Sequence, residues 1–436
     1  MMDWLKKIYW KLPFPNDVKQ LLSQKRYEHI LDKEKKYDAS GNIILRADSS
    51  LMRDYVKYVL ESYKKKSEYY CNYCTHESLN SNVCLVAYYL TQFHPNAKND
   101  EWWGKGTTEW NNVNQAVPQF VGHYQPRKPG ELGYYDLRIA DVMHRQIQIA
   151  KNYGIGAFCY YYYWFDNGER LLEYPLNVFL HDSSMDMPFF YCWANENWTK
   201  RFSGTNNDVL MRISQTEKNY KAFIDSVIPD LIDNRYYRIN NRPVISIYRP
   251  SLIPNPKVIL EYWRDRVDKC LGLTPYFVAV QERNNDMDWR AVGFDAETEF
   301  QPKQIQHNCR DITKEIKTIR KDFSGNIYDY KDLVEYKRYY LSTNAERKVY
   351  PSVMPMWDNT ARRNFRGTIF HGSTPDLYCK WLCDVIDKTQ NRTDLDDSLI
   401  FINAWNEWGE GAYLEPDDYF GYAYLEATYK ALRRMQ

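Results

Sequence analysis

Short apolar runs alternate with stretches of helical period from residue 85 to the end of the chain. Apolar residues at positions 137, 140, 143, 147 and 150 follow the 3.6-residue period of a helix, and further helices are predicted over residues 216–233, 256–271 and 374–388. The eight runs with strand composition are residues 85–90, 156–164, 189–193, 244–248, 277–281, 294–300, 350–357 and 398–402. This alternation predicts an α/β fold, a (β/α)8 TIM barrel with long βα loops.

The first 83 residues have a different pattern, charged and helix-like, without a catalytic grouping. We expect residues 1–83 to form a mainly helical N-terminal extension and residues 84–436 to form the catalytic barrel domain. Residues 1–15 predict an amphipathic helix with Trp4 and Leu12 on one side and lysines around the other. Such a helix either docks on its own domain or makes a weak contact with an anionic membrane surface.

Composition and charge narrow the range of partners. The chain has 58 basic and 57 acidic residues and a net charge of +1, so no global field attracts nucleic acid, and no nucleic-acid partner is expected. The 39 tyrosines and 14 tryptophans suit a cleft that stacks on sugar faces, or else a tyrosine-rich core. The N-terminus lacks the apolar region of a signal peptide, and no window is apolar enough to span a membrane, which predicts a cytoplasmic protein. The oligomeric state stays open.

Nine cysteines, an odd number in a long chain, are typical of reduced thiols. Cys71 and Cys74 form the one metal-like pair in the sequence, but zinc needs two more ligands. The candidates His76, Cys84 and the pair at 379 and 383 do not form a second matched pair, so free thiols are the expectation and a structural zinc is the alternative. The predicted strand ends also lack a matched His/Asp ligand set, so catalysis is expected to need no metal and no cofactor.

The final strand leads into residues 403–411, which carry two carboxylates and two tryptophans. In an extended chain Glu407 and Glu410 would lie roughly 10 Å apart on opposite faces. In a turn at Gly409 they would lie about 5–6 Å apart on one side, close to the spacing in retaining glycosidases. The alternative is that both acids cap a helix or solvate a loop. We predict that Glu407 and Glu410 are the catalytic pair, with the raised pKa of a general acid on Glu410 beside Trp408.

Polar and aromatic residues also follow the other predicted strands, where barrel enzymes place their sites. Arg249 and Arg363 each have the alternative role of a loop clamp on a carboxylate. With no phosphate loop and no dinucleotide fingerprint, the pattern predicts a neutral oligosaccharide or polysaccharide substrate. The residues predicted to bind it are His94, Trp103, Glu109, Trp110, Tyr124, Trp193, Asn195, Glu196, Tyr248, Trp357, Asp358 and Asn406.

The same motifs closely resemble those of the WbsX-type family, whose members occur among lipopolysaccharide O-antigen biosynthesis proteins. They are often labelled glycosyltransferases and carry a glycoside hydrolase family 99-like domain. The resemblance runs from about residue 85 to the C-terminus, through the motifs at residues 88–95, 101–110, 122–126, 192–199, 356–362 and 403–411.

A more distant resemblance is to the family 99 endo-α-mannosidases, (β/α)8 retaining enzymes with an Asn-Glu-Trp-x-Glu-Gly motif on the last strand. It implies that Glu407 is the base for the sugar 2-hydroxyl, which displaces the leaving group to form an anhydrosugar. Glu410 is then the general acid/base. This chain has Gly409 where the mannosidases tend to carry His.

Three classes of function are consistent with this pattern. The first is a retaining glycoside hydrolase or transglycosylase acting on a bacterial surface polysaccharide with mannose-type or related sugars, favoured by the lack of a nucleotide-phosphate cradle. The second is a glycosyltransferase of O-antigen, lipopolysaccharide or capsule biosynthesis, favoured by the lack of a secretion signal. The third, a non-catalytic sugar-binding module, would keep the aromatic residues but would not need both acids.

Overall fold

The computed structural model describes residues 36–37, 43–44, 49–62, 65–199, 209–283, 285–320, 322–341 and 347–434. The chain divides into two compact units, Met1–Tyr63 and Lys64–Gln436. In the first unit β1 (Lys36–Tyr37) pairs antiparallel with β2 (Ile43–Ile44), and α3 (Ser49–Ser62) is a helix. The amphipathic helix predicted over residues 1–15 lies outside the described residues. The division of the chain at residue 83 stays a prediction.

Parallel strands form a ring in the second unit, in the order β14-β12-β11-β10-β6-β4-β3-β18-β15, which closes where β14 and β15 meet. β14 and β15 are two halves of one strand, because Pro351 between them has no N–H to donate to the ladder. The Pro351 carbonyl still accepts a hydrogen bond of 2.9 Å from the Phe401 N–H, which keeps the ring closed. The predicted (β/α)8 barrel is therefore confirmed. Its strands are β3 (Cys84–Tyr89), β4 (Ile155–Trp164), β6 (Phe189–Trp193), β10 (Arg242–Ile247), β11 (Tyr276–Val280), β12 (Ala296–Thr298), β14 (Val349–Tyr350), β15 (Ser352–Val353) and β18 (Leu399–Ile402).

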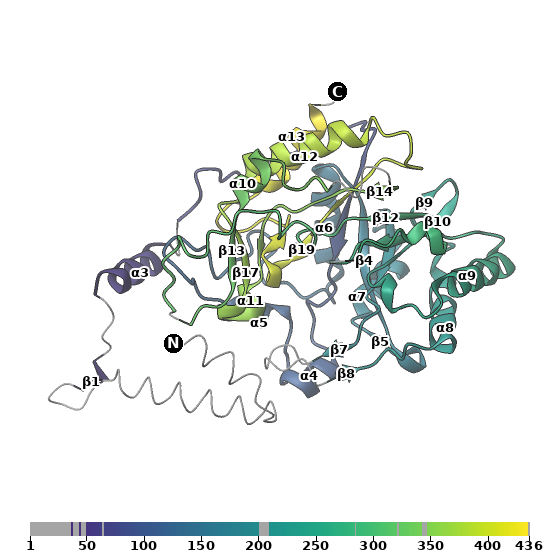
Figure 1. Cartoon of the computed structure of the whole chain (residues 1–436), viewed down its shortest axis with the longest axis horizontal. Helices are drawn as coiled ribbons and strands as arrows, with labels where there is room; N and C mark the ends of the chain where they lie inside the picture. Colours follow the sequence, from purple (N-terminus) through teal and green to yellow (C-terminus); the bar gives the residue numbers. More distant parts are fainter. Residues whose placement is uncertain are drawn as a thin grey trace. The chain divides into compact units, whose positions relative to one another are not determined.

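Helices cover the outside of these strands, so both faces of the sheet are buried and the strands read as nearly unbroken apolar runs. In Figure 1, α12 and α13 lie side by side, as do α8 and α9. Between β11 and β12, the described residues of the connection form the short 3-10 turn η5 (Trp289–Val292) and no longer helix. The covering helices are α6 (Ala140–Asn152), α7 (Tyr174–His181), α8 (Glu217–Val227), α9 (Pro256–Leu271), α10 (Tyr330–Glu335), α12 (Pro375–Thr389) and α13 (Ala423–Arg433).

Local sequence sets the ends of the predicted helices. α9 begins at Pro256, whose missing N–H is harmless in the first turn, and ends at Gly272 with a φ of 64°. The Thr374 side chain accepts the hydrogen bond of Leu377 N–H and caps α12. Both helices occur where the sequence predicts them.

Long connections follow the C-terminal ends of the strands and carry short elements of their own. After β3 come α4 (Ala97–Trp103) and α5 (Glu109–Gln115), and after β18 come β19 (Asn406–Glu407), η8 (Trp408–Glu410) and β20 (Ala412–Tyr413). The strand predicted over residues 350–357 ends at Val353, because Trp357 belongs to a separate strand that pairs with β17. The other short elements are β5 (Arg170–Leu171), β7 (Trp198–Thr199), β8 (Val209–Met211), β9 (Arg238–Ile239), β13 (Asn326–Asp329), β16 (Trp357–Asp358), α11 (Thr360–Arg363) and β17 (Thr368–His371).

Residues 65–83, which precede β3, contain no helix. They are held by the loop before α13: Ser67 N–H donates to the Tyr419 carbonyl at 2.8 Å, and Tyr422 N–H donates to the Cys71 carbonyl at 2.9 Å. None of the helices in the described part of the chain has the length and apolar character that a membrane span requires.

Candidate active site

One arginine contacts three carboxylates at the C-terminal end of the barrel. Arg362 donates from Nε to Glu109 Oε1 at 2.7 Å and from Nη2 to Glu407 Oε2 at 2.8 Å, and its Nη1 forms an ion pair of 2.8 Å with Glu410 Oε1. We call these four residues the acid cluster. With all groups ionised it carries three negative charges and one positive charge, so two negative charges are uncompensated within it.

The turn after β18 presents the two predicted catalytic acids. Glu407 ends β19, and the next three residues form η8, the turn that the sequence predicts at Gly409. Gly411 closes the turn with a φ of 57°, a conformation that favours glycine, and β20 then pairs back onto β19. The side chain of Glu407 is 7% exposed and that of Glu410 is 24% exposed, so Glu410 is the more accessible acid.

The bridge through Arg362 limits the separation of the two acids. Because the terminal nitrogens of one guanidinium are only about 2.3 Å apart, the bound oxygens of Glu407 and Glu410 lie within roughly 8 Å of each other. Retaining glycosidases separate their carboxyl groups by about 5–5.5 Å and inverting ones by about 6.5–9.5 Å. Both acids can therefore reach one sugar ring, and this upper limit is compatible with either stereochemistry.

Gly409 has no side chain, and the acid cluster occupies the space that a side chain would fill. A Cβ atom at this position would lie 1.8 Å from Glu109 Oε1 and 2.8 Å from Arg362 Nε. A side chain at this position would therefore have to displace the ion pair of Glu109 and Arg362. The missing side chain between Trp408 and Glu410 is thus a steric requirement of the cluster.

Several effects combine in the pKa of Glu407. Burial raises it, Arg362 lowers it, and the neighbouring charges of Glu410 and Glu109 raise it, with a net result of about 8. Burial also opposes the charge of Arg362, but the three carboxylates hold its pKa well above its usual range. Arg362 thus stays positively charged, whereas the pKa of Glu407 is shifted upward from its usual range.

The two tryptophans of the last motif belong to the core. Trp405 is fully buried, and Trp408 stacks on Tyr413 with ring centroids 3.8 Å apart. Trp408 Nε1 donates to Glu415 Oε2 at 2.6 Å, and burial raises the pKa of Glu415 to about 7. These two indole rings therefore pack in the core next to the turn and do not line a sugar site.

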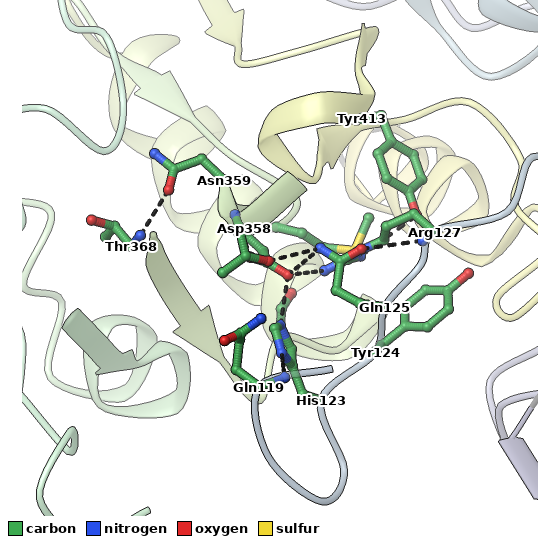
Figure 2. Close-up of polar contacts among 12 residues, drawn as sticks. Gln119, His123, Tyr124, Gln125, Arg127, Asp358, Asn359, Thr368 and Tyr413 are labelled. Atoms are coloured by element: carbon green, nitrogen blue, oxygen red, sulfur yellow. Dashed lines mark hydrogen bonds and ion pairs between the residues drawn. The ribbon is translucent and has the colours of Figure 1, made fainter. Parts of the chain in front are cut away.

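Asp358 lies in a buried polar network, shown in Figure 2. Its Oδ2 accepts from Gln125 Nε2 at 2.6 Å and lies 2.7 Å from His123 Nε2, and its Oδ1 accepts from the Thr360 hydroxyl at 2.6 Å. Burial opposes the carboxylate charge, but His123 and Arg127 hold the pKa of Asp358 well below its usual range. The network fixes the start of α11, the helix that carries Arg362.

Other residues predicted to bind substrate are buried and bonded to the protein. Asn406 accepts from Leu90 N–H at 2.7 Å and donates to the Leu90 carbonyl at 2.9 Å, which joins the ends of β18 and β3. Asn195 accepts from Arg249 N–H at 2.7 Å and donates to the Arg249 carbonyl at 2.8 Å. These two side chains set the position of the backbone around the site.

Three further predicted residues have contacts of the same kind. Trp193 is fully buried, stacks on Phe223 with centroids 3.9 Å apart and donates to the Trp164 carbonyl. Trp110 donates to the Tyr135 carbonyl at 2.8 Å, and His94 Nδ1 lies 2.9 Å from the Thr91 carbonyl oxygen. Burial also lowers the pKa of His94, which favours the neutral ring.

The remaining predicted residues are closer to solvent. Trp103, Tyr124, Glu196 and Tyr248 are half-buried, whereas Trp357 is 7% exposed. Tyr124 donates to Asp417 Oδ2 at 3.1 Å, and Glu196 forms an ion pair of 2.9 Å with Arg249.

Sequence reasoning left one member and several neighbours of the acid cluster out of the candidate site. Arg362 is the most important omission, because it contacts all three carboxylates. Tyr163, at the C-terminal end of β4, is half-buried; burial raises its pKa well above the usual range and the charge of Glu407 adds to the shift. Lys303 has its ammonium 3.5 Å from the centre of the Tyr248 ring, and burial lowers its pKa to about 8. The tyrosine run at the end of β4 was the available signal for Tyr163.

The family described as "Glycosyltransferase WbsX" matches this chain over residues 85–428. The chain belongs to the WbsX glycosyltransferase family. The resemblance given by its motifs is therefore confirmed.

This chain is also similar to two relatives in sequence and to two solved structures in fold. Two proteins described as "Uncharacterized protein WxcX", from two strains of Xanthomonas campestris pv. campestris, are 41% identical over 350 residues, which is 80% of this chain and 50% of theirs. The chain thus spans about half the length of these relatives.

A "Glycoside hydrolase-like protein" has a TM-score of 0.54 at 14% identity, covering 83% of this chain and 97% of its own. The GH99 endo-α-mannosidase of Bacteroides thetaiotaomicron in complex with bis-tris-propane has a TM-score of 0.50 at 14% identity, covering 80% and 96%. These structures share the fold of this chain.

Proposed function

We propose that this chain is a retaining glycoside hydrolase or transglycosylase that acts on a bacterial surface polysaccharide with mannose-type or related sugars. The observation that carries the proposal is the contact of one guanidinium with both Glu407 and Glu410, at 2.8 Å each. Two carboxyl groups within reach of one sugar ring are what glycoside cleavage needs. The fold shared with a GH99 endo-α-mannosidase supports the same chemistry.

In the proposed first step, Glu407 removes the proton of the sugar 2-hydroxyl. The 2-oxygen then bonds to the anomeric carbon, the glycosidic bond breaks, and Glu410 gives its proton to the departing oxygen. In the second step Glu410 takes a proton from water or an acceptor hydroxyl, whose oxygen attacks the anomeric carbon. The bond between the anomeric carbon and the 2-oxygen breaks during this attack, and the 2-oxygen regains its proton from Glu407. Two displacements at one carbon retain its configuration.

We assign Arg362 as a positioning residue for this pair. It holds both carboxylates in place before the reaction, and Glu109 fixes its Nε from the opposite side. When Glu407 accepts a proton it loses its charge, so its attraction to Arg362 weakens as the reaction proceeds. The bidentate reach of a guanidinium suits this role, whereas a lysine offers only a single charged atom.

A glycosyltransferase of O-antigen, lipopolysaccharide or capsule biosynthesis is the second candidate. The description of the matching family supports it. In that case the same acids would serve transfer from an activated sugar donor to a sugar hydroxyl.

The product formed from defined oligosaccharides separates these candidates. We would incubate the protein with mannan and O-antigen fragments, with and without sugar nucleotides, and identify the products by mass spectrometry. The proposal expects shorter or rearranged oligosaccharides without any sugar nucleotide, and loss of that product in Glu407→Gln and Glu410→Gln. Glu335→Gln, an exposed acid on α10, is the matched control. Chain extension that strictly requires a sugar nucleotide would favour the transferase, and binding without any product would contradict both candidates.

A further inference from the structure

Three metal-ligating side chains from distant parts of the chain meet outside the acid cluster. Cys74 and His76 precede β3, and Glu426 lies in the first turn of α13. Their ligand atoms all lie within 4.8 Å of one another, and His76 Nε2 is 2.8 Å from Glu426 Oε1. Among the described residues this is the one such group of His, Cys, Asp and Glu side chains.

The loop that carries Cys74 and His76 is fixed by the end of α6. Cys74 N–H donates to the Tyr153 hydroxyl at 3.0 Å. The Asn152 side chain donates to the Cys74 carbonyl at 2.8 Å and accepts from His76 N–H at 2.9 Å. The backbone of both ligands is therefore held before any ion binds.

The imidazole of His76 is oriented as well. It stacks on Tyr429 with ring centroids 3.8 Å apart and planes inclined by 14°. The side chains of His76 and Glu426 are only 14% and 16% exposed, whereas Cys74 is exposed. Solvent thus reaches the group from the side of the thiol, which gives an ion a path of entry.

The donor set matches the preferences of zinc. Thiolate, imidazole and carboxylate are the three ligand types that Zn²⁺ accepts, and a thiol disfavours Mg²⁺ and Ca²⁺. In a tetrahedral site with bonds of about 2.0–2.3 Å, neighbouring ligand atoms lie roughly 3.3–3.6 Å apart. The observed separations, from 2.8 Å up to at most 4.8 Å, bracket this value. A thiolate and a carboxylate also balance the two positive charges of the ion.

We propose that Cys74, His76 and Glu426 bind one Zn²⁺ ion, with water as the fourth ligand, and that the ion ties the segment before β3 to α13. The sequence paired Cys74 with Cys71, but Cys71 lies outside this group. The third ligand is instead the carboxylate of Glu426, which lies 350 residues further along the chain than His76. The proposal is independent of the proposed function, because the acid cluster shares no residue with the group.

Metal content of tag-free protein tests the proposal. Protein loaded with Zn²⁺ alone and then dialysed is analysed by inductively coupled plasma mass spectrometry. We expect about one zinc per chain in the wild type and at least tenfold weaker binding in Cys74→Ser and His76→Gln. Cys270→Ser, another exposed cysteine, and His144→Gln, whose ring lies 2.9 Å from Asp182, are matched controls that should keep the zinc. Equal zinc content in the wild type and Cys74→Ser would overturn the proposal.

Two measurements on the wild type keep the test decisive if a variant fails to fold. Zn²⁺ should raise the thermal midpoint of the metal-free protein, since a ligand that binds only the folded state stabilises it. Co²⁺ in place of Zn²⁺ should give the charge-transfer absorption of a thiolate ligand. A midpoint unchanged by Zn²⁺, or a cobalt spectrum without a thiolate band, would contradict the assignment.

Discussion

Arg362 carries one positive charge between three carboxylates, and its removal would leave three acids in mutual repulsion. Glu109 is 1% exposed and Glu407 is 5% exposed, so neither can be rehydrated easily. Breaking a buried ion pair by removing one partner typically costs about 3–5 kcal/mol. The pKa of Glu407, already raised by burial, would therefore rise further without Arg362.

For Arg362→Gln we predict that kcat/KM falls by about 10²-fold or more and that the remaining activity moves to higher pH. Arg362→Lys should recover only part of the loss, because one ammonium cannot contact three carboxylates at once. Arg363→Gln, the exposed neighbour on α11, is the control and should keep the activity. Measuring kcat/KM against pH for the three variants separates a charge effect from a loss of folded protein. An unshifted profile in Arg362→Gln would count against the positioning role.

The raised pKa of Glu407 predicts the direction of the pH dependence. A general base acts in its ionised form, and the fraction of ionised Glu407 increases as the pH rises through about 8. We therefore predict that kcat/KM increases between about pH 6 and pH 8. Steady-state kinetics in buffers of constant ionic strength measure this. A rate that instead falls over this range would assign the acid role to Glu407.

Glu410 is the accessible acid, and its proposed role gives a different signature. Glu410→Gln removes the proton donor, so the loss should be about 10²-fold or more for natural glycosides and milder for aryl glycosides with good leaving groups. Glu407→Gln should impair both substrates alike. Because a 2-hydroxyl is the proposed nucleophile, 2-fluoro glycosides should not react. A covalent adduct trapped on Glu407 would rule out this route and indicate an ordinary carboxylate nucleophile.

At the scale of elements, the turn η8 and the helix α11 form one unit through Gly409. Glu109 and Arg362 fill the volume of a side chain at this position, as the 1.8 Å approach of a Cβ atom to Glu109 Oε1 shows. The unit therefore depends on contacts between three connections, after β3, after the β14/β15 strand and after β18.

Gly409→Ala should lower kcat/KM by at least tenfold, because the added methyl group displaces the ion pair that holds the acids. Its backbone is not in the left-handed region, so the effect should come from the collision and not from strain. Gly372→Ala is the control. Gly372 has a φ of 81° and no atom within 4 Å of an added Cβ, so the substitution should cost about 1 kcal/mol of stability and leave the activity unchanged. Enzyme kinetics together with thermal unfolding distinguish the two effects. Full activity of Gly409→Ala would mean that the cluster rearranges without consequence.

The strands could be predicted from the sequence because a sheet covered on both faces needs apolar residues at every position, as in Phe189–Trp193. The turn around Gly409 was also predictable, from glycine and from the spacing of the acids. Arg362 was not, since its partners Glu109 and Glu407 are 253 and 45 residues away along the chain. Trp408 was predicted to lie against Glu410 because the two are close in sequence, but in the turn η8 the ring of Trp408 stacks on Tyr413. Such pairings depend on tertiary contacts that periodicity does not encode.

At the scale of the whole molecule, the acid cluster and the proposed zinc site share no residue. The acid cluster joins connections that follow barrel strands, whereas Cys74, His76 and Glu426 join the segment before β3 to α13. The proposed zinc ion therefore stabilises the fold without touching the reacting sugar.

This separation predicts that metal removal affects stability and not chemistry. After dialysis against EDTA, kcat at a temperature well below the unfolding transition should equal that of the zinc-loaded protein, because the proposed proton transfers involve only Glu407 and Glu410. The thermal midpoint should fall, since the free energy of Zn²⁺ binding is then lost from the folded state. Activity assays and thermal scans on the same samples measure both effects, with Cys74→Ser as a protein that EDTA should not change. Loss of kcat in still-folded protein, restored by one divalent ion, would instead place a metal in the reaction and contradict catalysis by the two acids alone.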